Sequence, residues 1–183
     1  MARVLIPLAD GCEELEAVTL IDLLRRAGIT VVTAGLRTGP VTASRGVQLI
    51  PDTTLDAVLA ESFDLLLLPG GGKGAAALAA DARMIALLKQ QAAAGRYSAA
   101  ICAAPQALAA AGLLDHNRAT SFPGSLQNLR IPGLQYVEEP VVQDGTVLTS
   151  RGPGTAMDFA LHIIELLADR VTRDKVEAGL QRP

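Results

Sequence analysis

The chain has 183 residues, of which half are hydrophobic and only 3% aromatic, and a formal net charge of −3. This length suits one domain, residues 1–183, with a sizeable core of Ala, Leu, Val and Ile. The charge balance argues against nucleic-acid binding, which calls for a basic face. No stretch is typical of a membrane span, and the apolar stretch before Asp10 is too short for a secretory signal. Two cysteines make no disulfide framework, so a reducing cytoplasm is the expected location.

The first two-thirds of the chain alternates short apolar runs with helical patterns. This alternation predicts an α/β fold, a mostly parallel sheet with helices wound around it. A glycine-rich segment, Pro69–Gly74, is expected to be a loop. The predicted strands are Val4–Leu8, Thr30–Ala34, Val47–Ile50 (a small strand that can pair with Val41–Thr42), Asp64–Leu68 and Ser98–Ile101. The predicted helices are Glu13–Ala27, Asp81–Ala94 and Ala104–Ala111.

The last third is richer in short β runs and ends in helices. Gln143–Thr146 is typical of a hairpin turn between two of these runs. No linker or long repeat interrupts the chain, which again favours a single domain. The predicted strands here are Ala119–Ser121, Gln135–Glu138, Val141–Val142 and Val147–Thr149, and the predicted helices are Thr155–Leu167 and Arg173–Leu180.

The first predicted helix is apolar around more of its circumference than a surface helix needs. One interpretation is deep burial under the sheet. The other is that one face packs on the core and a second face packs on another subunit. The apolar residues concerned are Leu15, Val18, Leu20, Ile21, Leu23 and Leu24.

Cys102 lies where a predicted strand turns into a helix. Such a turn holds a side chain at the carboxyl edge of the sheet, where open α/β proteins build their sites. The N–H groups and positive dipole end of the following helix favour a thiolate there, which is the nucleophilic form of the side chain. The alternative interpretation is a small buried hydrophobic residue, because free cysteine is often that.

Three acidic residues follow the first predicted strand, at the same expected edge. Glu13 and Glu14 fit the dipole of a helix start. Glu16 lies one turn further on and can point toward another strand's end. A carboxyl group beside a thiolate is driven toward its protonated form, and it could then donate a hydrogen bond and move protons. The alternative is that Glu16 too only complements the helix start.

The glycine segment fits neither common nucleotide motif. A dinucleotide fold would want an acidic residue at the end of the next strand, where Cys102 stands instead. A phosphate-binding P-loop would want Ser or Thr after Lys73, where Gly74 stands. We therefore expect an anion or oxyanion cradle of backbone N–H groups.

The two histidines give no metal cluster and no partner for a cysteine hydrolase. His162 falls in an apolar helix and is expected in the core, and His116 falls in a polar loop. Cys12 is a second thiol at the same edge. Its pairing with Cys102 under oxidation is a hypothesis, because disulfide geometry is strict.

Taken together, five motifs resemble the ThiJ/PfpI superfamily, and they are most similar to its parkinsonism-associated deglycase branch, which includes YajL-like bacterial proteins. The likeness covers essentially the whole chain, in order. The motifs are Gly11–Glu16 (GCEELE), Ser44–Val47 (SRGV), Leu68–Gly71 (LPGG), Ala100–Pro105 (AICAAP) and Thr149–Thr155 (TSRGPGT).

This resemblance implies a flavodoxin-like sandwich with a nucleophile elbow and a homodimer built partly on the first helix. It also implies that Cys102 is an oxidation-sensitive nucleophile and Glu16 its protonated partner. The N–H groups of Gly71 and Ala103 would form the oxyanion pocket. Gly70 would also be a substrate-binding residue, and Arg45 would lie near the dimer seam beside the site. No metal or organic cofactor is implied.

Two positions depart from related patterns. Hydrolytic relatives carry a histidine directly after the nucleophile, where this chain has Ala103, so peptidase activity is not expected. Other relatives carry a histidine at the position of Phe122, and YajL-like members share the phenylalanine. A general base is therefore missing at that place.

The expected function is protection against carbonyl and oxidative stress. In this interpretation Cys102 attacks glyoxal, methylglyoxal or their early adducts on protein or nucleotide amines and on thiols, and Glu16 relays protons to give a 2-hydroxy acid. The alternative is a redox-sensing thiol protein or holdase chaperone without significant turnover, in which Cys102 oxidises to a sulfinate.

Overall fold

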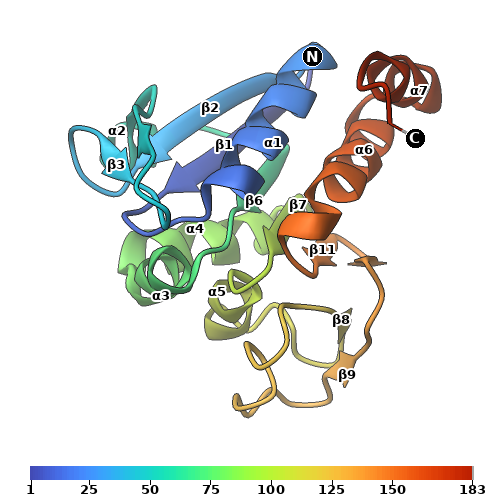
Figure 1. Ribbon diagram of the computed structural model, residues 1–183. Coiled ribbons are helices and arrows are strands. Elements are labelled where there is room, and N and C mark those ends of the chain that lie inside the picture. The colour runs from blue at the N-terminus through green and yellow to red at the C-terminus, as the bar shows by residue number, and fades with distance from the viewer. Residues whose placement is uncertain (183) are drawn as a thin grey trace.

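The computed structural model describes residues 1–182, and a seven-stranded sheet forms its centre (Figure 1). The spatial order is β10-β11-β7-β6-β1-β2-β5, and all neighbours are parallel except β10 and β11. The prediction of a mostly parallel sheet is therefore confirmed. Its strands are β1 (Arg3–Leu8), β2 (Thr30–Gly35), β5 (Thr53–Thr54), β6 (Leu65–Leu68), β7 (Tyr97–Ile101), β10 (Val141–Asp144) and β11 (Val147–Ser150).

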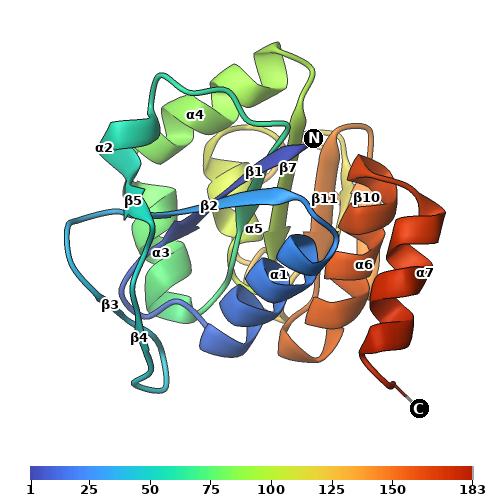
Figure 2. The same cartoon turned by 90° about the horizontal axis from the view of Figure 1, so that it is seen from above.

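Helices cover both faces of this sheet, and Figure 2 shows the two groups on opposite sides. Three helices, α1 (Glu14–Arg26), α6 (Ala156–Leu167) and α7 (Arg170–Gly179), contribute to one core cluster. The other cluster takes residues from α2 (Leu55–Val58), α3 (Gly72–Ala80), α4 (Ala82–Ala93) and α5 (Pro105–Ala110). A short 3-10 turn, Pro153–Thr155, precedes α6.

The apolar runs divide between these two clusters residue by residue. In β6, Leu65 and Leu67 belong to the first cluster, and Leu66 and Leu68 belong to the second. Successive side chains of a strand point to opposite faces, so a strand covered on both sides needs apolar residues at every position. This explains why the strand lacks polar residues.

Two small sheets lie outside the central one. β3 (Val41–Thr42) and β4 (Gln48–Leu49) pair, as the sequence predicted, and the structure shows that the pairing is antiparallel. β8 (Arg118–Ala119) and β9 (Gln135–Tyr136) pair in parallel. The predicted hairpin turn between β10 and β11 is confirmed.

The segment Pro69–Gly74 is a loop only at its start, because α3 already begins at Gly72. The prediction of a loop to Gly74 is wrong here, since alanines follow the glycines and favour a helix. Asp81 then accepts hydrogen bonds from the N–H groups of Arg83 and Met84 and caps the next helix. The short elements β5 and α2 were not predicted.

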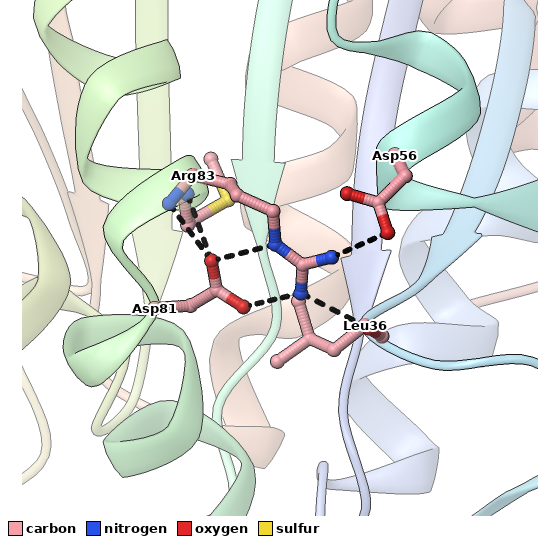
Figure 3. A network of polar contacts seen from close by, with 5 residues as sticks. Leu36, Asp56, Asp81 and Arg83 are labelled. Carbon is pink, nitrogen blue, oxygen red and sulfur yellow. Dashed lines mark hydrogen bonds and ion pairs between the residues drawn. The ribbon is translucent and has the colours of Figure 1, made fainter.

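A charged network connects the start of α4 to α2 and to the residue that follows β2 (Figure 3). The Arg83 guanidinium lies 2.5 Å from the Asp81 carboxylate and 2.8 Å from that of Asp56, and it donates to the Leu36 carbonyl at 3.0 Å. These partners raise the pKa of Arg83, and Arg83 in turn lowers the pKa of Asp81. Arg83 thereby connects α4, α2 and the end of β2, and neither cysteine takes part in this network.

The first helix is not buried on all sides. Leu20 and Leu24 are fully buried, but Leu15 and Val18 are 52% and 47% exposed. The interpretation of deep burial under the sheet is therefore wrong, and an open apolar face remains. None of the helices within residues 1–182 combines the length and apolar character needed to cross a bilayer.

Candidate active site

Cys102 stands in a strained turn directly after β7. Its φ of 63° is in the left-handed region, which non-glycine residues rarely adopt. The turn is fixed on both sides, because the Cys102 N–H donates to the Ser150 carbonyl at 3.0 Å and the Phe122 N–H donates to the Cys102 carbonyl at 2.8 Å. Pro105 begins α5 shortly afterwards. The fold thus uses backbone strain to hold this side chain at the sheet edge, 8% exposed.

Glu16 reaches the same place from α1 and is fully buried. Its Oε2 accepts a hydrogen bond from the Gly70 N–H at 2.8 Å. Its Oε1 has no hydrogen-bond partner within residues 1–182. Among these residues, Cys102 is the one whose side-chain hydrogen bonding lowers the pKa of the Glu16 carboxyl. A buried carboxyl with an unsatisfied oxygen is costly, which suits a group poised to exchange a proton.

Gly70 packs against both of these side chains, and Gly71 packs against the backbone of the loop after β1. A carbon added at Gly70 would lie 2.6 Å from both Cys102 Cβ and Glu16 Oε2. Gly71 has a φ of 88°, and a carbon there would lie 2.5 Å from the Glu13 nitrogen. Only glycine lets the backbone approach this closely. Glu16, Gly70 and Cys102 follow β1, β6 and β7, respectively. They therefore meet at one place, because the carboxyl ends of parallel strands share one edge of the sheet.

Two backbone N–H groups favour the charged form of the Cys102 sulfur. Hydrogen bonding from Gly71 and Ala103 lowers the pKa of Cys102. These are the two groups that the sequence predicted for an oxyanion pocket. In the structure their effect falls on the Cys102 sulfur itself.

The net electrostatics differ from the sequence prediction. Burial, together with the Glu16 charge, raises the pKa of Cys102 to about 12, and burial raises the pKa of Glu16 to about 7. The prediction of a favoured thiolate is wrong in its net direction. The helix α5 has only six residues, and burial and the neighbouring carboxylate outweigh the two N–H donors.

The two groups titrate as a pair. Below about pH 7 the pair holds two protons, and above it one proton remains between sulfur and carboxyl. Moving that proton to Glu16 removes the charge that opposes the thiolate. A thiolate bonded to two N–H groups and a carboxylic acid is then the reactive arrangement.

Glu13 has a structural role that the sequence did not single out. Its carboxylate accepts from the Glu16 N–H at 2.8 Å and caps α1, and its own N–H donates to the Gly70 carbonyl at 3.0 Å. It therefore fixes the backbone that carries Glu16. The sequence signal for this cap was an acidic residue three positions before Glu16, the spacing between an N-cap side chain and the N–H group that it accepts from.

Arg45 is not brought to the thiol. Its backbone N–H donates to Glu14 at 2.7 Å, its side chain is exposed, and its guanidinium makes no ion pair within the described chain. Ser44 also donates to Glu14 at 2.7 Å. Glu14 thus anchors the β3–β4 turn to the start of α1.

Cys12 is fully buried, and burial raises its pKa to about 11. Both cysteines are free, and their pairing under oxidation stays a prediction. His162 is half-buried, not a core residue as expected, and its Nε2 lies 2.8 Å from the Gln143 amide oxygen. His116 is exposed. Within residues 1–182, no three His, Cys, Asp or Glu side chains gather so as to hold a metal ion.

A cavity of about 510 Å³ lies over the loop after β1, and neither Cys102 nor Glu16 lines it. It joins the loop after β1, the β3 hairpin and the first turn of α3. Its lining residues are Asp10, Gly11, Thr42, Ala43, Ser44, Gly72 and Lys73.

Sheet order and helices on both faces define a flavodoxin-like α/β protein, with a strained cysteine turn at the carboxyl edge of its sheet. The chain belongs to the DJ-1/PfpI family, whose model matches residues 2–166. It is 44% identical to Protein dj-1beta of Drosophila melanogaster over 96% of this chain and 95% of that protein. It is 38% identical to the glutathione-independent glyoxalase DJR-1.2 of Caenorhabditis elegans, over 91% of this chain and 88% of that protein.

Solved structures agree with this assignment. The crystal structure of Drosophila melanogaster DJ-1beta superposes with a TM-score of 0.94 at 43% identity, covering 100% of this chain and 98% of that one. The flavodoxin-like fold that the sequence resemblance implied is confirmed.

Proposed function

We propose that this protein is a cysteine-dependent carbonyl-stress enzyme that acts on glyoxal, methylglyoxal or their early adducts. The carrying observation is the meeting of Cys102, the buried Glu16 carboxyl and two N–H donors at one point. Membership of the DJ-1/PfpI family and the likeness to a relative named a glutathione-independent glyoxalase support it.

In the first step the Cys102 thiolate attacks the aldehyde carbon of methylglyoxal, and a C–S bond forms. The carbonyl oxygen gains negative charge. Once the C–S bond has formed, the sulfur no longer carries a charge, and the N–H groups of Gly71 and Ala103 are available to stabilise the oxyanion. The proton on Glu16 then passes to that oxygen and gives a hemithioacetal.

The ionised Glu16 next removes the proton from the former aldehyde carbon and returns a proton to the neighbouring carbon. The product is a thioester of a 2-hydroxy acid. Water hydrolyses it to lactate and restores the Cys102 thiol, so methylglyoxal and water give lactate and one proton. Oxidation of one carbon balances reduction of its neighbour, and no external oxidant or cofactor enters.

Early adducts of dicarbonyls with protein or nucleotide amines and with thiols enter the same cycle after their C–N or C–S bond breaks. The hydroxyl proton of the adduct moves to the leaving nitrogen or sulfur, which frees the amine or thiol and restores the aldehyde that Cys102 attacks. The 2-hydroxy acid is again the product, and this regeneration of the amine or thiol is the deglycase activity. The reaction needs no peptide-bond cleavage, and we expect no peptidase activity.

We further propose that one domain, residues 1–183, acts as a cytoplasmic homodimer through α1. The support is the open apolar face of Leu15 and Val18 on a helix whose other side is buried. Arg45 lies on the turn that Glu14 ties to the same helix, close to this face. A mass in light scattering equal to one chain would contradict the dimer, and Val18→Asp should lower the mass of a dimer by half.

The second candidate function is a redox-sensing thiol protein or holdase chaperone without significant turnover. Its support is the absence of any imidazole bonded to Cys102 or Glu16 within the described residues. The raised pKa of Cys102 argues against rapid turnover, and it favours the chaperone over the redox sensor. Oxidation of Cys102 to a sulfinate would place oxygens beside Glu16 and the N–H groups.

The deciding experiment is lactate formation from methylglyoxal in buffer free of amines and thiols. Wild type and Cys102→Ser are compared with a protein-free blank. Lactate from wild type alone supports the enzyme. No lactate above blank from either protein rejects the glyoxalase and favours the second candidate, which is then tested as aggregation suppression by wild type and Cys102→Ala.

A further inference from the structure

Phe122 is a solvent-exposed aromatic residue that lies next to Cys102 in the fold. It is 49% exposed. Its N–H donates to the carbonyl of Cys102 at 2.8 Å, so the two backbones are direct neighbours. Phe122 is therefore a direct neighbour of the turn that carries the thiol, and we take its ring as the nearest apolar surface to that turn.

The ring is held in place. A carbon added at Gly152 would lie 3.4 Å from Cδ2 of Phe122, so the ring packs on a glycine backbone. That glycine lies just beyond Ser150, whose carbonyl accepts the Cys102 N–H. The elbow, the ring and the end of β11 therefore form one surface.

The segment that carries the ring is also fixed. The Thr120 N–H donates to Thr149 Oγ1 at 2.9 Å, and the Tyr136 hydroxyl donates to the Ser121 carbonyl at 3.2 Å. The Ser125 N–H closes the following turn on the Phe122 carbonyl at 3.0 Å. A half-exposed ring on a backbone held at three points is a preformed surface.

We propose that Phe122 is a specificity-determining residue that favours carbonyl substrates with an apolar group on the reacting dicarbonyl over glyoxal and over substrates with a charged group there. This inference rests on the proposed function. The N–H groups of Gly71 and Ala103 and the Glu16 carboxyl supply the polar contacts at the thiol. Phe122 adds an apolar surface without a hydrogen-bonding group.

The preference follows from desolvation. An apolar substituent laid on the ring removes apolar area of both from water, which is favourable. A charged or hydrated substituent in the same place loses water and finds no replacement partner. Selectivity should therefore rise from glyoxal through methylglyoxal to phenylglyoxal.

The test compares kcat/KM for phenylglyoxal and glyoxal in wild type, Phe122→Leu and Phe122→Ser. Val171→Ser is the matched control, because Val171 is an exposed hydrophobic residue on α7. We expect the phenylglyoxal-to-glyoxal ratio to fall about tenfold in Phe122→Ser, to fall less in Phe122→Leu, and to stay unchanged in the control. A ratio within about twofold of wild type in Phe122→Ser overturns the proposal.

A second readout needs no turnover. The rates at which N-phenylmaleimide and 3-maleimidopropionate alkylate Cys102 are measured by mass spectrometry of its peptide. We expect the ratio of the two rates to fall about fivefold in Phe122→Ser. If wild type turns over no dicarbonyl, the proposed function fails and this ratio alone decides the role of Phe122. If Phe122→Ser changes only the mass in light scattering and leaves the alkylation ratio as in wild type, the ring belongs to an interface between copies and the proposal is overturned.

Discussion

Cys12 and Cys102 lie at the same edge of one sheet and belong to the same core cluster, yet their surroundings differ. Burial raises both pKa values, to about 11 and about 12 respectively. Acidity therefore does not separate the two thiols. What separates them is whether neighbouring groups can stabilise a negative charge on the sulfur and take up its proton.

The turn after β7 gives Cys102 a strained backbone, two N–H donors and a carboxyl that can take its proton. The turn after β1 gives Cys12 no such partner. Its N–H and carbonyl are used to hold the Ala9 and Ser44 backbones, at 2.9 and 2.8 Å. One cysteine is built into a site, and the other is built into a loop.

Serine substitution tests this contrast most directly. Cys102→Ser should lower lactate formation from methylglyoxal by at least about 10³-fold, because the nucleophile is lost. Cys12→Ser should leave kcat/KM within about threefold, since Cys12 contacts no reacting group. The measurement is enzymatic detection of lactate at matched folded concentration, and an equal loss in both variants would contradict the contrast.

The proton partner should give the next largest effect. With two protons on the pair below about pH 7, neither a thiolate nor a base is present, so kcat/KM should rise as pH increases through about 7. Glu16→Gln should lower kcat/KM about 10²-fold and abolish that rise. A pH profile that keeps its step near 7 in the variant would assign the step to another group.

The stability of the protein should change with pH in the opposite direction. The folded pKa of Glu16 is raised from 4.5 to about 7, so the folded state binds more protons than the unfolded state between these values. The contribution of Glu16 to stability is present below about pH 4.5 and is lost as pH rises through about 7. Glu16→Gln should remove this part of the slope, by at most about 3 kcal/mol, in urea unfolding at pH 5 and pH 8. An unchanged slope would mean that Glu16 is ionised throughout.

Much of this site could be predicted from the sequence. Cys102, Glu16 and Gly70 follow strands or open the helix after one, and parallel strands bring such positions to one edge. What could not be predicted was the balance of charge at Cys102. That balance depends on how deeply the fold buries the thiol and on the distance between groups that are 86 residues apart in the chain.

The fold shows the same division. Uninterrupted apolar runs such as Leu65–Leu68 identify a doubly covered strand from the sequence alone. Helix α3, Gly72–Ala80, was not predicted at all, because its first residues are glycines, which usually indicate a loop. Phe122 was noted as a missing base, but its backbone bond to Cys102 is a tertiary contact without a local signal.

The smallest effect separates two neighbouring glycines at this edge. Gly70→Ala places a carbon 2.6 Å from Cys102 Cβ and Glu16 Oε2, so we expect a loss of about 1–3 kcal/mol in the free energy of unfolding. Gly72→Ala is the matched control, because no atom lies within 4 Å of its added carbon and alanine suits the first residue of α3. It should change stability by less than about 1 kcal/mol. Urea unfolding at one pH compares the two variants, and equal losses would show that the close packing of Gly70 against the thiol and the carboxyl is not what requires a glycine there.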